Sequence, residues 1–229
     1  MALKTFVKIS AINNLSDARY CAGMGVDMLG FALEPTNPDS ISPEKYTEII
    51  GWLSGVKFVG EFEQSNLKQI NEILENYPIN ALQIANEAVI AEIQHKKEKA
   101  DLEDFIPIIF KINISENNQK NNQKSLNFED LSTLFEKYKK TVTYFLLENS
   151  PDSIDKITID FSPNELEQLE KLAARFPIIL GSGFNKNNVN DLIDNYKISG
   201  ISLKGGAEIR AGYKDFDDLA EILEIIEID

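Results

Sequence analysis

The chain alternates between short apolar segments and longer segments with helical periodicity along its whole length of 229 residues. The apolar segments are rich in β-branched and aromatic residues, which predicts buried strands. The expected strands are Thr5–Ala11, Met28–Leu33, Lys57–Phe62, Ala81–Ile84, Phe105–Ile112, Thr143–Leu147, Pro177–Leu180 and Gly200–Leu203. In the intervening segments apolar residues recur every three to four positions, which predicts helices with one buried face. The expected helices are Leu15–Met24, Pro43–Leu53, Leu67–Asn76, Ala88–Lys99, Phe128–Lys139, Pro163–Arg175, Lys186–Asn195 and Phe216–Ile226.

Eight strands, each followed by a helix, predict a single closed (β/α)8 barrel, a TIM barrel of the α/β class, over residues 1–229. An open doubly wound sheet is the main alternative, and the count of eight favours the closed barrel. Cys21 and Trp52 are expected to pack helices against the barrel. A polar segment rich in Asn and Gln, residues 115–125, follows the fifth strand; we expect a surface loop there, with a lid as the alternative.

Composition limits the partners of the chain. A formal net charge of −14 argues against nucleic acids and anionic membranes, because both favour Lys and Arg. No apolar run approaches the ~20 residues of a membrane-spanning helix, and the first residues do not resemble a signal peptide. The single cysteine, Cys21, fits a cytoplasmic protein. One His and one Cys argue against a zinc site, and we expect no metal. We also expect no cofactor. The expected oligomeric state is a monomer or a homodimer.

Two glycine turns follow the last two expected strands. Gly181-Ser182-Gly183 comes directly after Pro177–Leu180, and Lys204-Gly205-Gly206 comes after Gly200–Leu203. Glycines at such positions let bare backbone N–H groups approach an anion closely. The turns after the last two strands are also where (β/α)8 barrels frequently hold a phosphate. The pair predicts a site for a small phosphorylated molecule, with tight turns that bind nothing as the alternative.

Six segments carry motifs in a fixed order along the chain: Val7–Ala18, Gly25–Phe31, Asn37–Glu44, Leu82–Ile84, Phe184–Val189 and Gly200–Asp215. In this order they resemble the phosphoribosylanthranilate isomerase family of tryptophan biosynthesis over nearly the whole chain. The resemblance implies an Amadori rearrangement, in which an acid protonates the furanose ring oxygen and a base removes a proton from C2. It also implies that Gln83, in the fourth strand, belongs to the substrate site.

The resemblance implies three site residues at positions where this chain carries a different residue type. Ser10 stands where the family has the cysteine base, Glu148 where it has the aspartate acid, and Asp39 where it has an arginine near the anthranilate end of the substrate. A hydroxyl has a far higher pKa than the ~8.5 of a thiol, so Ser10 is a weak base. Glu148 keeps a carboxyl group and is therefore the candidate acid.

The phosphate side of the expected site departs less from the family pattern. Gly183, Gly205 and Gly206 are kept, whereas Ser182 replaces a glycine. Ser202 replaces an acidic residue of the eighth strand, and Lys8 and Lys204 supply positive charge at strand ends. Lys8 is expected either in the site or in an ion pair with a carboxylate of another strand.

The pattern leaves two main functions open. One is an isomerase of a phosphoribosyl substrate with Glu148 as acid and Ser10, or a residue displaced from the family position, as base. The other is a catalytically inactive or repurposed protein that binds a sugar phosphate. A related barrel enzyme acting on another ribose phosphate is a weaker third alternative, because the sequence shows no replacement acid–base pair.

Overall fold

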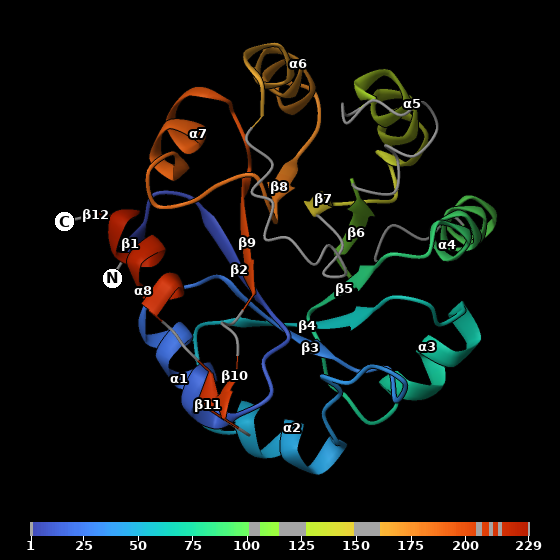
Figure 1. The fold of residues 1–229 in the computed structure, drawn as a ribbon. Helices are drawn as coiled ribbons and strands as arrows, with labels where there is room; N and C mark the ends of the chain where they lie inside the picture. Colours follow the sequence, from blue (N-terminus) through green and yellow to red (C-terminus); the bar gives the residue numbers. More distant parts are fainter. Residues whose placement is uncertain are drawn as a thin grey trace.

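Eight parallel strands close into a barrel in the order β2-β3-β4-β5-β6-β7-β8-β9, and the helices surround it (Figure 1). The structure is a computed structural model that describes residues 2–100, 106–114, 127–148, 161–204, 208–210, 213–214 and 217–228. The predicted (β/α)8 fold is therefore confirmed. The barrel strands are β2 (Phe6–Ser10), β3 (Met28–Ala32), β4 (Lys57–Phe62), β5 (Ala81–Ile84), β6 (Ile108–Asn113), β7 (Tyr144–Glu148), β8 (Ile178–Leu180) and β9 (Gly200–Lys204). The helices are α1 (Leu15–Gly23), α2 (Pro43–Ile50), α3 (Leu67–Leu74), α4 (Glu87–Ala100), α5 (Phe128–Tyr138), α6 (Pro163–Ala173), α7 (Val189–Asn195) and α8 (Asp217–Ile225).

The barrel closes where its first strand, β2, pairs with its last strand, β9. The register of this seam runs from Phe6 opposite Gly200 to Ser10 opposite Lys204. A Cβ atom at Gly200 would lie 2.3 Å from the backbone oxygen of Phe6. Only glycine fits this approach of the two strands, so the residue type at the start of β9 is part of how the barrel closes.

Polar side chains fix where several helices begin. Ser162 accepts from the backbone N–H of Glu165, and the Glu165 carboxylate in turn accepts from the Ser162 N–H at 2.9 Å, with Pro163 as the first helical residue of α6. α2 begins in a similar way: the Ser42 side chain accepts from the backbone N–H of Lys45, and Pro43 is the first helical residue. A capping side chain satisfies an N–H group that the helix leaves unpaired, and proline at the first position lacks that N–H.

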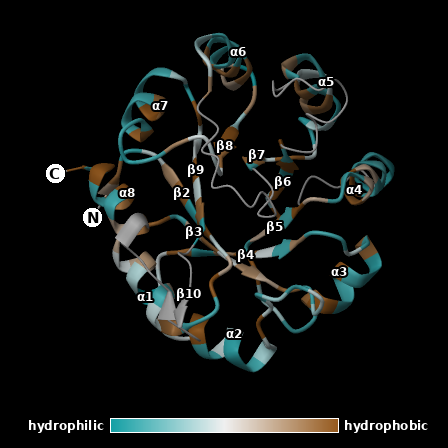
Figure 2. Ribbon diagram, in the orientation of Figure 1, coloured by the Kyte–Doolittle hydropathy of each residue, from teal (hydrophilic) through white to brown (hydrophobic). Residues whose placement is uncertain are grey.

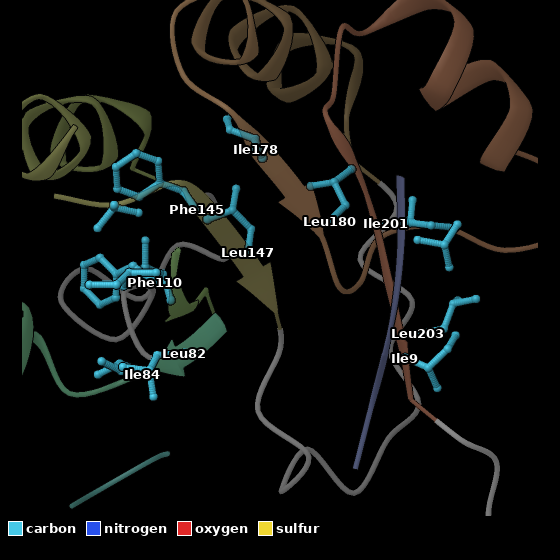
Figure 3. Packing of buried hydrophobic residues seen from close by; sticks show 14 of the residues in the cluster. Ile9, Leu82, Ile84, Phe110, Phe145, Leu147, Ile178, Leu180, Ile201 and Leu203 are labelled. Atoms are coloured by element: carbon cyan, nitrogen blue, oxygen red, sulfur yellow. The ribbon is translucent and has the colours of Figure 1, made fainter. Parts of the chain in front are cut away.

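The main core lies between the strands and the helices. Figure 3 shows outward-facing side chains of this layer from β2, β5, β6, β7, β8 and β9, among them Ile9, Phe110 and Leu180. They pack against buried helix residues such as Cys21, which is fully buried as predicted. In Figure 2 the helices have hydrophobic and hydrophilic sides, in keeping with the periodicity seen in the sequence.

A second, smaller core fills the amino-terminal half of the barrel interior. Its buried members come from six different strands: Met28, Val59, Ala81, Ile109, Leu146 and Ile179. The rings of Phe6 and Tyr144 stack on one another beside it, with centroids 5.2 Å apart. Because strand side chains alternate, the next inward positions toward the carboxyl ends are Lys8, Glu61, Gln83, Lys111 and Ser202. The interior therefore changes from apolar to polar toward the barrel mouth, by which we mean the end where the strands' carboxyl ends meet.

Two short ladders outside the barrel were not predicted. β1 (Ala2–Leu3) pairs with β12 (Glu227–Ile228), which brings the two ends of the chain together beside α8 (Figure 1). β10 (Glu208–Arg210) pairs with β11 (Tyr213–Lys214) between β9 and α8. Strands of two or three residues carry too little hydrophobic pattern to be recognised in a sequence.

One packing prediction is wrong. The side chain of Trp52 is 68% exposed, because α2 ends at Ile50 and Trp52 lies in the turn after it rather than on the buried face. The predicted loop at 115–125 and the turn residues Gly205 and Gly206 lie outside the described residues. In the part of the chain that the structure describes, no helix has the length and apolarity that a membrane crossing needs.

Candidate functional site

Lys8 is fully buried inside the barrel, and its ammonium group has two side-chain acceptors. Nζ donates to the Oγ of Ser10 at 2.7 Å and to Oε1 of Glu61, on β4. The second carboxylate oxygen of Glu61 accepts the backbone N–H of Ala11 at 3.1 Å. A buried charge needs a partner and further hydrogen bonds to offset its loss of hydration, and this cluster supplies both. Of the two roles expected for Lys8, the structure shows the ion pair.

Gly30 makes the room that this ion pair needs. It lies on β3, between the strands that carry Lys8 and Glu61. A Cβ atom at this position would lie 2.0 Å from Oε1 of Glu61 and 3.0 Å from Nζ of Lys8. The carboxylate therefore crosses directly over the glycine to reach the lysine.

Ser10, the residue at the expected base position, is enclosed by this cluster. Its side chain is 7% exposed, and its Oγ lies 3.3 Å from the Oγ of Ser202 in addition to accepting from Lys8. Ser202 stands opposite Lys8 in the seam register, so an acidic side chain there would lie beside the lysine. In this chain the carboxylate comes instead from Glu61, two strands away.

Glu148, the candidate acid, is the last residue of β7 and belongs to a second ion-pair cluster. Nζ of Lys111, on β6, lies 3.0 Å from Oε2 of Glu148 and 2.8 Å from Oε1 of Glu63. Burial alone would lower the pKa of Lys111, but the two carboxylates raise it by more, so the pKa lies above its ordinary value. Lys111 therefore stays charged while two carboxylates share it.

The loop that carries Glu63 is held by a buried carboxylate, Glu34. Its oxygens accept the consecutive backbone N–H groups of Glu63, Gln64 and Ser65 at 2.9, 2.9 and 2.5 Å. Burial raises the pKa of Glu34, but the bonds from Ser65, Glu63 and Gln64 lower it by more, so the pKa is below its ordinary value. A groove of about 770 Å³ lies beside this loop, and none of the predicted site residues lines it.

On the expected phosphate side, β8 ends in the Gly181-Ser182-Gly183 turn. Gly183 has a φ of +84°, a left-handed conformation that favours glycine, and its backbone oxygen accepts from the side chain of Asn188 at 3.3 Å. Ser182 has a buried Oγ that finds no hydrogen-bond partner among the described residues. Lys204, at the end of β9, lies with its Nζ 3.5 Å from Oδ2 of Asp39. The two lie together, but as an exposed ion pair.

Gln83 faces the barrel interior from β5, opposite Glu61 in the strand register. Its side chain is 2% exposed, and its Oε1 has no hydrogen-bond donor within the described part of the chain. A buried acceptor without a donor is costly, so such atoms indicate a place where a ligand or water donates.

The structure thus brings Lys8, Ser10 and Ser202 into one cluster and places Glu148 in another. Glu61, Glu63 and Lys111 were not predicted from the sequence. The sequence does contain a signal for these residues. Each charged residue interrupts or directly follows an apolar strand at an inward position, where a charge without a partner would be strongly destabilising. Among the described residues no group of His, Cys, Asp and Glu side chains is placed to hold a metal ion.

Comparison with known proteins identifies the family. The family model of N-(5'-phosphoribosyl)anthranilate (PRA) isomerase matches residues 7–225. The N-(5'-phosphoribosyl)anthranilate isomerase of Synechococcus sp. (strain JA-2-3B'a(2-13)) is 26% identical over 224 residues, which cover 96% of this chain and 90% of that protein. Among solved structures, phosphoribosyl anthranilate isomerase from Thermotoga maritima superimposes with a TM-score of 0.71 at 22% identity, covering 97% of this chain and 98% of that one. A phosphoribosyl anthranilate isomerase in complex with reduced 1-(o-carboxyphenylamino)-1-deoxyribulose 5-phosphate has a TM-score of 0.68 at 22% identity, with 97% and 98% covered. The chain belongs to the N-(5'-phosphoribosyl)anthranilate isomerase family.

Proposed function

We propose that this barrel binds a small sugar phosphate at its mouth and does not use Ser10 and Glu148 as the base and acid of an Amadori isomerisation. The observation that carries the proposal is the contact between Lys8 and Ser10. An oxygen that already accepts a hydrogen bond from an ammonium ion is a poor proton acceptor, and a hydroxyl is a far weaker base than a thiol to begin with.

The arrangement around Glu148 supports the same conclusion. A general acid must bring a proton to the substrate, and the Glu148 carboxylate is held as the ion-pair partner of Lys111 at 3.0 Å. Lys111 also forms an ion pair with Glu63, in the loop after β4, so both carboxylates share its positive charge. Both expected catalytic groups are therefore engaged by lysines of neighbouring inward positions.

Support for phosphate binding comes from the turn after β8, the strand next to β7. The turn after β8 places a buried Ser182 hydroxyl without a partner among the described residues beside the left-handed Gly183. A hydroxyl and exposed backbone N–H groups at such a turn suit phosphate oxygens. (β/α)8 barrels frequently hold a phosphate with the loops after their last two strands, and the turn after β8 is the first of these two loops.

The second candidate is a retained isomerase. It is favoured by family membership, by relatives that match over nearly their whole length, and by the presence of a carboxyl group at the end of β7. In that case the substrate must displace Lys111 from Glu148 and Lys8 from Ser10.

Titration calorimetry with ribose 5-phosphate and with ribose tests the proposal. We expect binding that depends on the phosphate, and about tenfold weaker binding in Ser182→Ala because one hydrogen bond to a charged group is lost. Ser54→Ala removes an exposed hydroxyl in the loop after α2 and is the matched control. Equal affinity for ribose and ribose 5-phosphate would contradict phosphate binding.

A turnover assay with N-(5'-phosphoribosyl)anthranilate separates the two candidates. Under the proposal, the unmodified protein gives no turnover that depends on Ser10 or Glu148, so Ser10→Ala and Glu148→Gln leave the measured rate unchanged. Turnover at a rate that both substitutions reduce by orders of magnitude would establish the isomerase instead.

A further inference from the structure

Lys204 is the last residue of β9, and its side chain faces the barrel mouth. Its register partner across the seam is Ser10, and it follows Ser202 by two positions. Side chains two positions apart on a strand lie on the same face, and the hydroxyl of Ser202 lies 3.3 Å from that of Ser10 inside the barrel. The Lys204 side chain therefore leaves its strand at the level of Ser10 and points toward the space that a ligand enters.

Two elements flank Lys204. On one side is the turn after β8, because β8 pairs with β9 up to Leu180 opposite Ile201 (Figure 1). On the other side are β2 and then β3, and the loop after β3 carries Asp39. Oδ2 of Asp39 lies 3.5 Å from Nζ of Lys204, so this ion pair joins the two strands on either side of β2. The pair directs the ammonium group toward β3 and away from β8.

The turn after β8 needs a nearby cation if it is to hold an anion. A Cβ atom at Gly181 would lie 3.1 Å from Cβ and Cγ of Glu148, so the Glu148 side chain lies against the turn. Glu148 and Glu63 share the positive charge of Lys111, which leaves this cluster with one negative charge in excess. That charge repels an anion at the turn, and a hydrogen bond from the Ser182 hydroxyl offsets only part of the repulsion. A positive charge from β9 would offset the rest.

We propose that Asp39 and the phosphate group of a ligand compete for Lys204. In the free protein Lys204 pairs with Asp39, and in the bound protein its ammonium group turns to a phosphate at the turn after β8. The proposal rests on the proposed function, which puts the phosphate at that turn. Asp39 is then an internal competitor that weakens ligand binding, and it determines how much of the charge of Lys204 the ligand meets.

The pair of Asp39 and Lys204 is suited to such an exchange. The side chain of Lys204 is 51% exposed and that of Asp39 is 35% exposed, and ion pairs in contact with solvent contribute little to stability. A phosphate monoester carries about −1.5 to −2 charges at neutral pH, more than a carboxylate, so it attracts the ammonium group more strongly. Because lysine has a flexible four-carbon side chain, the ammonium group exchanges partners while the strand stays in place.

Titration calorimetry with ribose 5-phosphate at low ionic strength tests the competition. We expect Asp39→Asn to bind ribose 5-phosphate about three- to tenfold more tightly than the parent chain, because Lys204 is then released. In the double variant Asp39→Asn with Lys204→Gln this gain should be lost. Asp194→Asn is the matched control: it removes one carboxylate charge from the exposed pair with Lys4, 3.9 Å apart, and should leave the affinity unchanged.

Three results would overturn the inference while leaving phosphate binding intact. The first is binding of ribose 5-phosphate by the parent chain with no gain in Asp39→Asn. The second is an equal gain in Asp194→Asn, which would reflect net charge alone. The third is a gain of the same size in the double variant, since Asp39 would then act through its own charge and not through Lys204. If neither the parent chain nor Asp39→Asn binds ribose 5-phosphate, the proposed function fails, and the inference with it.

Discussion

Glu61 reaches the ammonium group of Lys8 from two strands away, although Ser202 stands directly opposite Lys8 on the adjacent strand. The pair is buried in the barrel interior, with side-chain exposures of 0% for Lys8 and 8% for Glu61. A buried ion pair contributes little net stability when intact, but the loss of one partner leaves an uncompensated charge.

Glu61→Leu is therefore expected to lower the free energy of unfolding by about 3–5 kcal/mol, measured by urea denaturation. Adding Ser202→Asp should recover part of this loss, because the seam register places residue 202 beside Lys8. Ser202→Asp alone, in the presence of Glu61, should not stabilise the protein. If the double variant is no more stable than Glu61→Leu, the interpretation of position 202 as an alternative counterion is wrong.

Gly30→Ala tests whether the carboxylate must cross over β3. The new Cβ would lie 2.0 Å from Oε1 of Glu61, so the ion pair or the strand has to move. We expect a loss of about 1–3 kcal/mol in denaturant unfolding. Gly23→Ala is the control: nothing lies within 4 Å of a Cβ at this last residue of α1, so a small effect of either sign, within about 1 kcal/mol, is expected. Equal effects of the two substitutions would contradict the steric argument.

Glu34 predicts a dependence of stability on acid pH. Burial raises the pKa of Glu34, but the hydrogen bonds from Ser65, Glu63 and Gln64 lower it by a larger amount. The pKa in the folded protein therefore lies below the ordinary value of 4.5. A group with a depressed folded pKa contributes stability that is fully present above its unfolded pKa and is lost as pH falls through the folded pKa. Urea unfolding at a series of pH values from 7 to 3 should show this loss below about 4.5.

In Glu34→Gln that part of the pH dependence should disappear, while the protein is less stable at pH 7. Glu48→Gln, at an exposed position of α2, is the comparison, and the acid profile of this variant should stay close to that of the parent chain. An unchanged slope in Glu34→Gln would show that other carboxylates cause the acid sensitivity.

Cys21 is expected to be unreactive in the folded protein. Burial, with a further contribution from Asp17, raises the pKa of its thiol to about 12, and its side chain is fully buried. Thiolate is the reactive form, so a disulfide reagent such as Ellman's should titrate no thiol at pH 8 and one thiol after unfolding in guanidinium. Rapid reaction under native conditions would mean that α1 opens locally.

The barrel could be predicted from the sequence because each strand and helix carries its own local pattern. Ile178–Leu180 is apolar throughout, and Pro163 after Ser162 marks a helix start that the structure reproduces. Trp52 was misplaced because the helical pattern of α2 continues beyond Ile50, where the helix ends.

The site was harder to predict because its contacts join residues far apart in sequence. Lys8 and Glu61 are separated by 53 positions, and Lys111 meets Glu63 across 48. Alternation along a strand predicts that these side chains point inward, but not which of them meet. The identity of each partner depends on strand order and register, and on the space left at Gly30.

The seam between β2 and β9 has a consequence for how the chain is made. Lys8 and Ser202 come together there, and Ser10 lies across from Lys204. A nascent chain leaves the ribosome from its amino terminus, so β2 can pair with β3 early but lacks its other neighbour, β9, until nearly the whole polypeptide has been synthesised. Such distant pairing is slow compared with the formation of local contacts. The cluster of Lys8, Ser10 and Ser202 is therefore among the last parts of the protein to be completed, and a translation product truncated before β9 lacks it.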